Sequence, residues 1–135
     1  MTFMTLHAGG TFDIDAWDAE KPYEEENGTK LSRVQVGKTF HGDMVGTSTA
    51  ELLTVETQAG PAAYVGLETV RAILHGREGT FVLQHSAGGG AEGQWLRWEI
   101  VATSGTGELA GIQGRGTIEM SPDGGHSWTL DYTLD

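Results

Sequence analysis

Apolar and polar residues alternate along much of the chain, with a period of two rather than the 3.6 of a helix. Residues 10–17 are one case, because Phe12, Ile14 and Ala16 alternate with polar side chains. This alternation predicts a half-buried β-strand. Turn-forming glycine, asparagine and proline residues separate the runs. We predict further strands at 31–40, 44–55, 94–103, 116–120 and 126–134, and two more within 63–86.

About eight antiparallel strands with short connections predict an all-β fold with little or no helix. A sheet of this size can close into an eight-stranded β-barrel, which removes its exposed edges. A two-sheet sandwich is the alternative. The interior of such a barrel is filled by side chains or holds one small ligand. The length predicts one domain over residues 1–135. Residues 1–8 are expected to be a frayed lead-in or part of the first strand, and residues 18–30 an acidic surface loop.

The hairpin at residues 63–86 carries the most suggestive polar side chains. A two-residue turn centred on Gly76-Arg77 would place Glu68 opposite His85. Directly opposed residues share a face, with Cβ atoms ~5 Å apart. Tyr64 and Phe81 share that face, which is otherwise apolar. We therefore expect Glu68 and His85 to point into the barrel.

Two further turns extend this arrangement to a third strand. A turn at Gly42-Asp43 pairs Val34 with Glu51, and a turn centred on Ala59-Gly60 pairs Glu51 with Glu68. Under these registers, Glu51, Glu68 and His85 form one row across three strands. A one-residue error in register would move a side chain to the other face.

A carboxylate beside an imidazole can act as a general acid and base at neutral pH. Glu68 and His85 are therefore the candidate catalytic pair, and Glu51 is an auxiliary carboxylate. The alternative is a buried pair that satisfies its own hydrogen bonds, with Glu51 on the rim. Lys38 could pair with a carboxylate or extend to the rim. The candidate ligand-lining residues, which could equally be core, are Tyr64, Phe81, Trp98, Trp128 and Tyr132.

Composition excludes several classes of function. The chain has no cysteine, which excludes thiolate chemistry, and its formal net charge is −11. With no basic patch, nucleic-acid binding is not expected. The chain has neither the ~18-residue apolar run of a membrane helix nor a signal peptide, so we expect a cytoplasmic protein. The five histidines lack metal-ligand spacing, and we expect neither a metal nor another cofactor.

Three segments carry a resemblance to a known family: KLSRVQVGKTFHGDMVGTSTAELL, AAYVGLETVRAILHGREGTFVLQH and SGTGELAGIQGRG. They resemble a bacterial family of single-domain proteins that is classed as a domain of unknown function. The resemblance implies an eight-stranded antiparallel barrel similar to that of allene oxide cyclase. The GTGELAG stretch is also similar to a segment of allene oxide cyclase and dirigent barrels.

The wider group of barrels contains non-redox cyclases and isomerases. The resemblance therefore implies a cofactor-free cyclase or isomerase that acts on a small apolar molecule inside the barrel. A non-catalytic carrier of a small ligand and a structural or oligomerisation domain are the alternatives. Related barrels are often oligomeric, so a homo-oligomer is among the expected assemblies.

Overall fold

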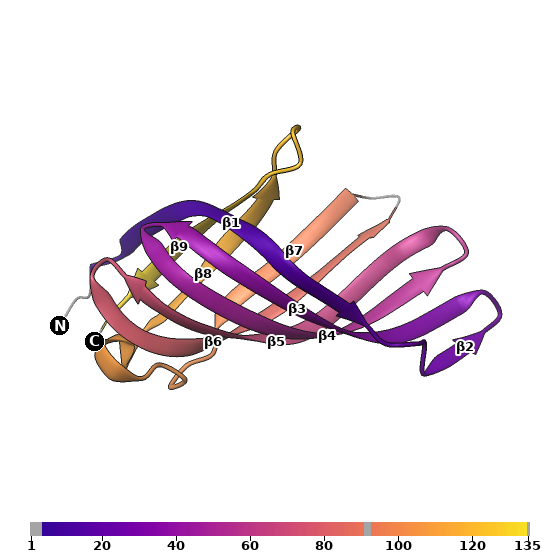
Figure 1. Ribbon diagram of the computed structural model, residues 1–135, viewed down its shortest axis with the longest axis horizontal. Helices are drawn as coiled ribbons and strands as arrows, with labels where there is room; N and C mark the ends of the chain where they lie inside the picture. The colour runs from indigo at the N-terminus through magenta and orange to yellow at the C-terminus, as the bar shows by residue number, and fades with distance from the viewer. Residues whose placement is uncertain (1–3, 91–92, 135) are drawn as a thin grey trace.

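The computed structural model describes residues 4–90 and 93–134, and its regular elements are β-strands apart from one short 3-10 turn (Figure 1). The elements are β1 (Leu6–Ala19), β2 (Glu24–Glu26), β3 (Thr29–Gly42), β4 (Met44–Thr57), β5 (Gly60–Leu74), β6 (Arg77–Gly90), β7 (Gly93–Ile100), η1 (Gly107–Leu109), β8 (Gln113–Met120) and β9 (His126–Thr133).

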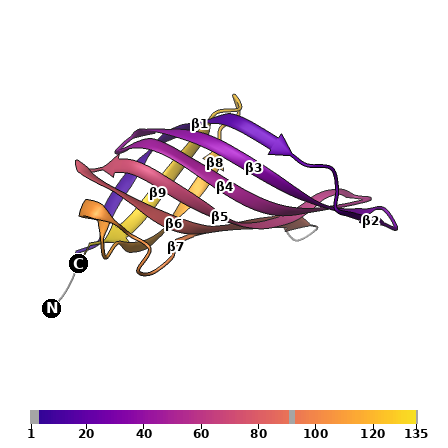
Figure 2. The same cartoon turned by 60° about the horizontal axis from the view of Figure 1, so that its bottom comes forward.

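All strand pairings are antiparallel, in the order β1-β9-β8-β7-β6-β5-β4-β3-β2. The first strand, β1, pairs with β9 on one side and with β3 on the other. This double pairing closes β1 and β3–β9 into a barrel, with β2 added outside as a short hairpin partner of β3 (Figure 2). The predicted eight-stranded antiparallel barrel is confirmed, and the sandwich is excluded.

Alternation along the strands decides which side chains enter the barrel, as predicted. In β3, Val34, Val36, Lys38 and Phe40 are all buried. The larger core cluster fills one part of the barrel and includes Phe40, Val70, Leu74, Phe81, Leu83, Trp98, Trp128, Leu130 and Tyr132. A smaller cluster comprises Val34, Val36, Ala50 and Leu52, with Tyr64 packed against it.

The turn between β5 and β6 differs from the predicted one by one position. It is formed by His75 and Gly76, with φ angles of 48° and 80°. Positive φ at both positions is typical of the type I′ turn, and histidine tolerates this region better than most residues. The register therefore shifts by two residues, so that Glu68 pairs with Leu83 and His85 with Gly66. A shift of two preserves the face, and Glu68 and His85 still point inward.

The turn between β3 and β4 moves Glu51 out of the predicted row. Val34 pairs with Leu52 rather than with Glu51, and Glu51 pairs with Gln35 on the outer face. The cause is the bonding of Asp43, whose N–H donates to the Gly9 carbonyl and whose Oδ2 accepts from the Gly9 N–H. These bonds to β1 hold Asp43 at the centre of the turn, which shifts the pairing by one residue.

The pairing of β4 with β5 also differs from the prediction. Ala50, not Glu51, lies opposite Glu68, and a bulge interrupts the register at Val55 and Glu56. The predicted row of Glu51, Glu68 and His85 is therefore wrong: Glu51 lies on the outer face, and His85 shares the inner face with Glu68 but is not directly opposite it.

The predicted acidic loop, residues 18–30, is partly strand. It contains β2, and its two ends belong to β1 and β3. At the N-terminus, β1 begins at Leu6, while residues 1–3 lie outside the described part. Among the described residues, no helix has the length and apolarity needed to cross a membrane.

The barrel wall is weakest between β7 and β8, which pair only at Glu99 and Arg115. In Figure 1 the tip of the β8–β9 hairpin points away from the end at which β7 begins. Ile14 and Trp17 pair with the buried residues Lys38 and Val36 and so belong to the inner face of β1. They are nevertheless 41% and 58% exposed. The inner face is thus open to solvent in this part of the barrel.

Candidate functional site

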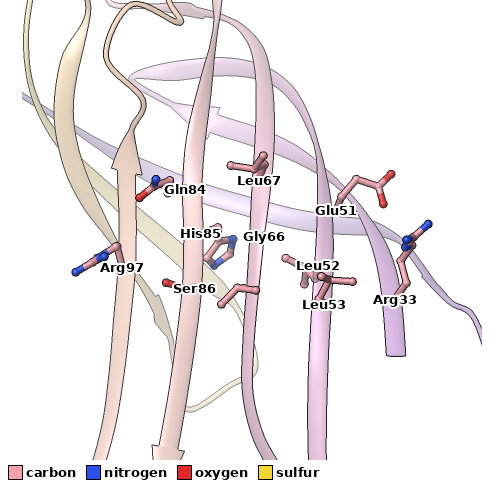
Figure 3. A pocket seen from close by; sticks show the side chains of 11 residues that line it. Arg33, Glu51, Leu52, Leu53, Gly66, Leu67, Gln84, His85, Ser86 and Arg97 are labelled. Carbon is pink, nitrogen blue, oxygen red and sulfur yellow. The ribbon is translucent and has the colours of Figure 1, made fainter. Parts of the chain in front are cut away.

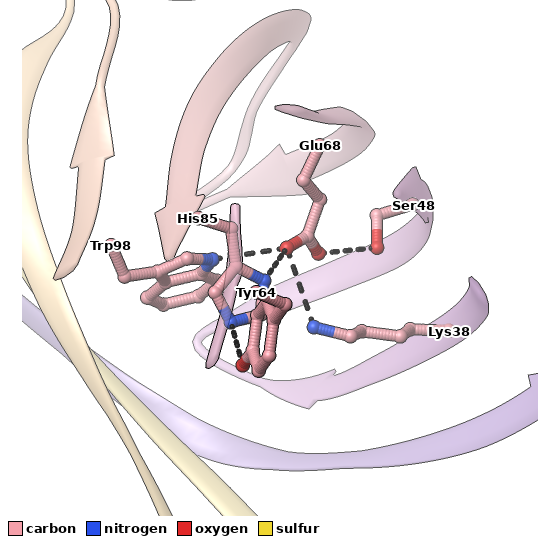
Figure 4. A network of polar contacts seen from close by, with 6 residues as sticks. All are labelled: Lys38, Ser48, Tyr64, Glu68, His85 and Trp98. Atoms are coloured by element: carbon pink, nitrogen blue, oxygen red, sulfur yellow. Dashed lines mark hydrogen bonds and ion pairs between the residues drawn. The ribbon is translucent and has the colours of Figure 1, made fainter. Parts of the chain in front are cut away.

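A network of polar side chains lies between the two core clusters and is centred on Glu68 of β5 (Figure 4). The side chain of Glu68 is fully buried. Its Oε1 accepts hydrogen bonds from Lys38 Nζ at 3.3 Å, His85 Nδ1 at 3.2 Å and Trp98 Nε1 at 3.1 Å. Its Oε2 accepts from Ser48 Oγ at 2.6 Å. The carboxylate is therefore surrounded by four donors from four other strands.

The donors keep Glu68 ionised despite its burial. Burial alone would raise the pKa of Glu68, but the hydrogen bond from His85, the charge of Lys38 and the hydrogen bond from Ser48 outweigh it and lower the pKa to about 2. Lys38 is itself only 4% exposed. Glu68 is therefore ionised at neutral pH and forms a buried ion pair with Lys38.

Glu68 also determines the tautomer of His85. An ionised carboxylate can only accept, so the Nδ1 that faces Glu68 must carry hydrogen. In the neutral imidazole the other nitrogen, Nε2, is then an acceptor, and Tyr64 Oη lies 2.9 Å from it. Burial, together with the charge of Glu68, raises the pKa of Tyr64 above its usual 10. The neutral phenol therefore donates to His85, which completes the chain Tyr64–His85–Glu68.

The sequence did not predict the hydrogen bonds that two members of the network, Trp98 and Ser48, donate to Glu68. Trp98 was predicted as pocket lining, but its indole also donates to Glu68. Gly116 of β8 makes room for that indole, because a Cβ on Gly116 would lie 2.7 Å from Trp98 Cε3. Ser48 was missed. The alternation of Ser48, Ala50 and Leu52 in β4 could have identified it, but the predicted two-residue turn at Gly42-Asp43 assigned these residues to the outer face.

The remaining candidate residues lie away from Tyr64. Phe81, Trp128 and Tyr132 are each 1% exposed and belong to the larger core cluster. Tyr132 Oη is 2.5 Å from Nδ1 of His75, at the β5–β6 turn. Tyr64 itself is only half-buried. The structure therefore brings together Lys38, Tyr64, Glu68, His85 and Trp98 in one hydrogen-bonded network, to which Phe81, Trp128 and Tyr132 do not belong.

A cavity of about 710 Å³ lies mainly on the outer side of the barrel wall, over β3–β7 (Figure 3). We call it the outer groove. Its lining comprises Arg33, Glu51, Leu52, Leu53, Val65, Gly66, Leu67, Gln84, His85, Ser86 and Arg97. Most of these side chains belong to the outer face, and the groove reaches His85 and Leu52 beside Gly66, which has no side chain. The outer groove and the inner network share His85 and no other residue.

The inner network also provides no obvious metal centre. Within residues 4–90 and 93–134, no three His, Asp or Glu side chains are grouped so that they could hold a metal ion. Every buried side-chain nitrogen or oxygen in this part of the chain has a hydrogen-bond partner. The side chains of the network can themselves exchange protons with a bound molecule.

Comparison with known proteins agrees with this fold. The model of the family described as "Protein of unknown function (DUF3224)" matches residues 8–132. The chain belongs to this family. A crystal structure of a DUF3224 protein of unknown function from Shewanella oneidensis MR-1 is similar, with 31% sequence identity, a TM-score of 0.87, and 99% of each chain covered.

The search among curated proteins found no match. The predicted membership of a bacterial family of unknown function is confirmed. The likeness to allene oxide cyclase remains a prediction.

Proposed function

We propose that this DUF3224 barrel binds a small apolar molecule and isomerises it without a cofactor, with Tyr64 exchanging protons with the substrate. The observation that carries the proposal is the hydrogen-bonded chain Tyr64–His85–Glu68. One end of this chain is the fully buried Glu68, and the other is the half-buried Tyr64 on the open part of the inner face. Such an arrangement connects a fixed charge to a group that a substrate can reach.

In this proposal Glu68 orients His85 and does not itself exchange protons. A carboxyl with a pKa of about 2 is ionised at neutral pH and is a poor proton carrier there. It holds the imidazole with hydrogen on Nδ1 and stabilises the imidazolium that forms when Nε2 accepts a proton. A buried carboxylate has the same role in hydrolytic Ser-His-Asp triads.

The step that this geometry supports is a proton shift along the substrate. The Tyr64 oxygen takes a proton from a carbon next to a substrate carbonyl, while its own phenolic proton passes to His85 Nε2. The C–H electron pair enters the carbonyl system as an enolate. His85 then returns its proton to Tyr64, which protonates a different carbon. A double bond has moved, and no electrons are gained or lost overall.

The surroundings of Tyr64 favour an apolar substrate. Its row across the inner face contains Thr54, Ala87 and Leu96, all half-buried. The exposed, inward-facing side chains of Ile14 and Trp17 add apolar surface to the same face of the barrel. The sparse pairing of β7 with β8 offers a place of entry. Small-molecule sites are usually apolar surfaces with a few polar groups.

A non-catalytic barrel is the second candidate function. The complete set of hydrogen bonds around Glu68 and the packed core around Phe81 and Trp128 favour it. In that case the network only fixes the strand register, and the barrel carries a ligand unchanged or serves as a structural or oligomerisation domain.

The test is the rate at which a panel of β,γ-unsaturated ketones takes up deuterium from D₂O, measured by NMR. We expect the wild-type protein to accelerate exchange for at least one compound, and Tyr64→Phe to lower that rate ~100-fold or more, since a positioned acid or base contributes at least this factor. Tyr23→Phe is the matched control, because Tyr23 is 60% exposed and outside the network. No acceleration with any compound, or equal rates for wild type and Tyr64→Phe, would refute the proposal.

A further inference from the structure

The outer face of β3–β7 carries two neighbouring rows of side chains that run across five strands. The first row comprises Arg33, Leu53, Val65, Ser86 and Arg97. The second row comprises Gln35, Glu51, Leu67, Gln84 and Glu99. Most of these residues line the outer groove, and Figure 3 shows Arg33 and Arg97 at its two sides.

The centre of these rows is apolar and exposed. Leu53, Val65 and Leu67 are 44%, 55% and 56% exposed, and they adjoin one another on β4 and β5. Contiguous exposed apolar surface of this kind marks an interaction site more often than isolated apolar residues do. Five strands at ~4.8 Å spacing make the face ~20 Å wide, enough for the centre of a small protein interface.

The charges at the margins identify the occupant. The first row has arginines at both ends, and the second row has Glu51 and Glu99. A small organic anion could use Arg33 and Arg97, but the two glutamates would repel it. The second copy of this chain would use all four charges, because each arginine could meet a glutamate of the other copy.

We propose that two copies of this chain associate through the outer groove about a two-fold axis that runs along the rows. Such an axis places the first row of each copy over the second row of the other, as a self-complementary interface requires. Val65 then lies over Leu67 of the partner subunit, and Arg97 over Glu99 of the partner subunit. Arg33 lies over Gln35 of the partner subunit, one strand from the partner's Glu51.

The contacts that these charged side chains make within one chain leave them able to pair with the other copy. Within one chain, Arg97 Nε is 3.7 Å from Glu99 Oε1, and the two side chains are 60% and 44% exposed. An exposed pair of this kind contributes little to folding, so the arginine can turn to the partner at small cost. Glu51 accepts from Gln35 Nε2 at 2.7 Å, which leaves its other carboxylate oxygen free for a partner's arginine.

The test is sedimentation velocity of the full chain over a range of protein concentrations. We expect a dimer whose dissociation constant rises ~100-fold in Leu67→Asp, since a charge placed at the apolar centre of an interface removes a main contact. Ile73→Asp is the matched control, because Ile73 lies on the outer face of the same strand and is 46% exposed but outside the groove. Its dissociation constant should stay within about twofold of wild type.

Charge reversal tests the axis and does not depend on Leu67→Asp folding well. Arg97→Glu and Glu99→Arg should each weaken the dimer about tenfold, and the double variant should restore it, because the pairs re-form across the axis. A chain that is monomeric at all concentrations, a dimer equally affected by Leu67→Asp and Ile73→Asp, or a double variant no better than its parents would each overturn the proposal. A monomer that binds an apolar dye in the groove would overturn it in favour of a small ligand.

Discussion

Replacing Glu68 by glutamine removes the buried negative charge and nearly preserves the volume of the side chain. In the wild-type protein, Lys38 Nζ lies 3.3 Å from the carboxylate, and the two side chains are 5% and 0% exposed. The variant leaves the Lys38 ammonium buried without a counter-charge. We therefore expect Glu68→Gln to be about 3–5 kcal/mol less stable than wild type at pH 7, the usual cost of breaking a buried ion pair from one side.

The pKa of Glu68 gives a second, independent magnitude. It falls from an ordinary 4.5 to about 2 in the folded protein. At about 1.4 kcal/mol per pKa unit, this difference of about 2.5 corresponds to about 3 kcal/mol of stability. Because the folded-state pKa is the lower one, this stability is fully present above about pH 4.5. It is lost as the pH falls towards 2, where the folded protein also takes up the proton.

The assay is urea denaturation of wild type and Glu68→Gln at intervals between pH 7 and pH 2. The difference in unfolding free energy should shrink by about 3 kcal/mol as the pH falls from 5 to 2. Glu51→Gln is the control, because it makes the same chemical change on an exposed side chain of the outer face. It should stay within about 0.5 kcal/mol of wild type.

One result would refute the reasoning. If the wild type and Glu68→Gln give parallel profiles of stability against pH, the carboxyl of Glu68 does not titrate at a lowered pKa in the folded protein. The hydrogen bonds from His85 and Ser48 and the charge of Lys38 would then not outweigh the effect of burial on the pKa of Glu68.

Two further predictions concern the partners of Glu68. Lys38→Met should lower the free energy of unfolding by about 3–5 kcal/mol at pH 7, because it leaves Glu68 unpaired. The double variant Lys38→Met/Glu68→Gln should recover much of this loss. If urea denaturation shows that the two losses simply add, the two groups are not coupled. Gly116→Ala should lower the stability by more than about 2 kcal/mol, because its Cβ would lie 2.1 Å from the Thr129 carbonyl oxygen and 2.7 Å from Trp98 Cε3. Its control is Gly90→Ala, where a Cβ meets nothing within 4 Å, and equal thermal denaturation midpoints for the two variants would contradict the role given to Gly116.

The alternation of residues was enough to predict the barrel and most of its inner face. In β3, Val34, Val36, Lys38 and Phe40 occupy alternate positions and so share one face, and all four are buried. It also placed Glu68 and His85 on the same inner face, although the turn at His75-Gly76 was assigned one position too late. That error was harmless, because a register shift of two returns every side chain to the same face.

The local pattern of residues could not determine the strand register where residues of distant strands contact a turn or a side chain. Two hydrogen bonds to Gly9 of β1 hold Asp43 at the centre of the turn. The pairing of β3 with β4 therefore shifts by one residue, so that Glu51 points outward and Ser48 inward. The contact of Trp98 with Glu68 likewise depends on Gly116, a residue of the neighbouring strand. The sequence by itself thus determined which side chains alternate within each strand, since that period is local. Only the closed barrel decided which strands face each other at which residue, and hence which four side chains donate to the buried carboxylate.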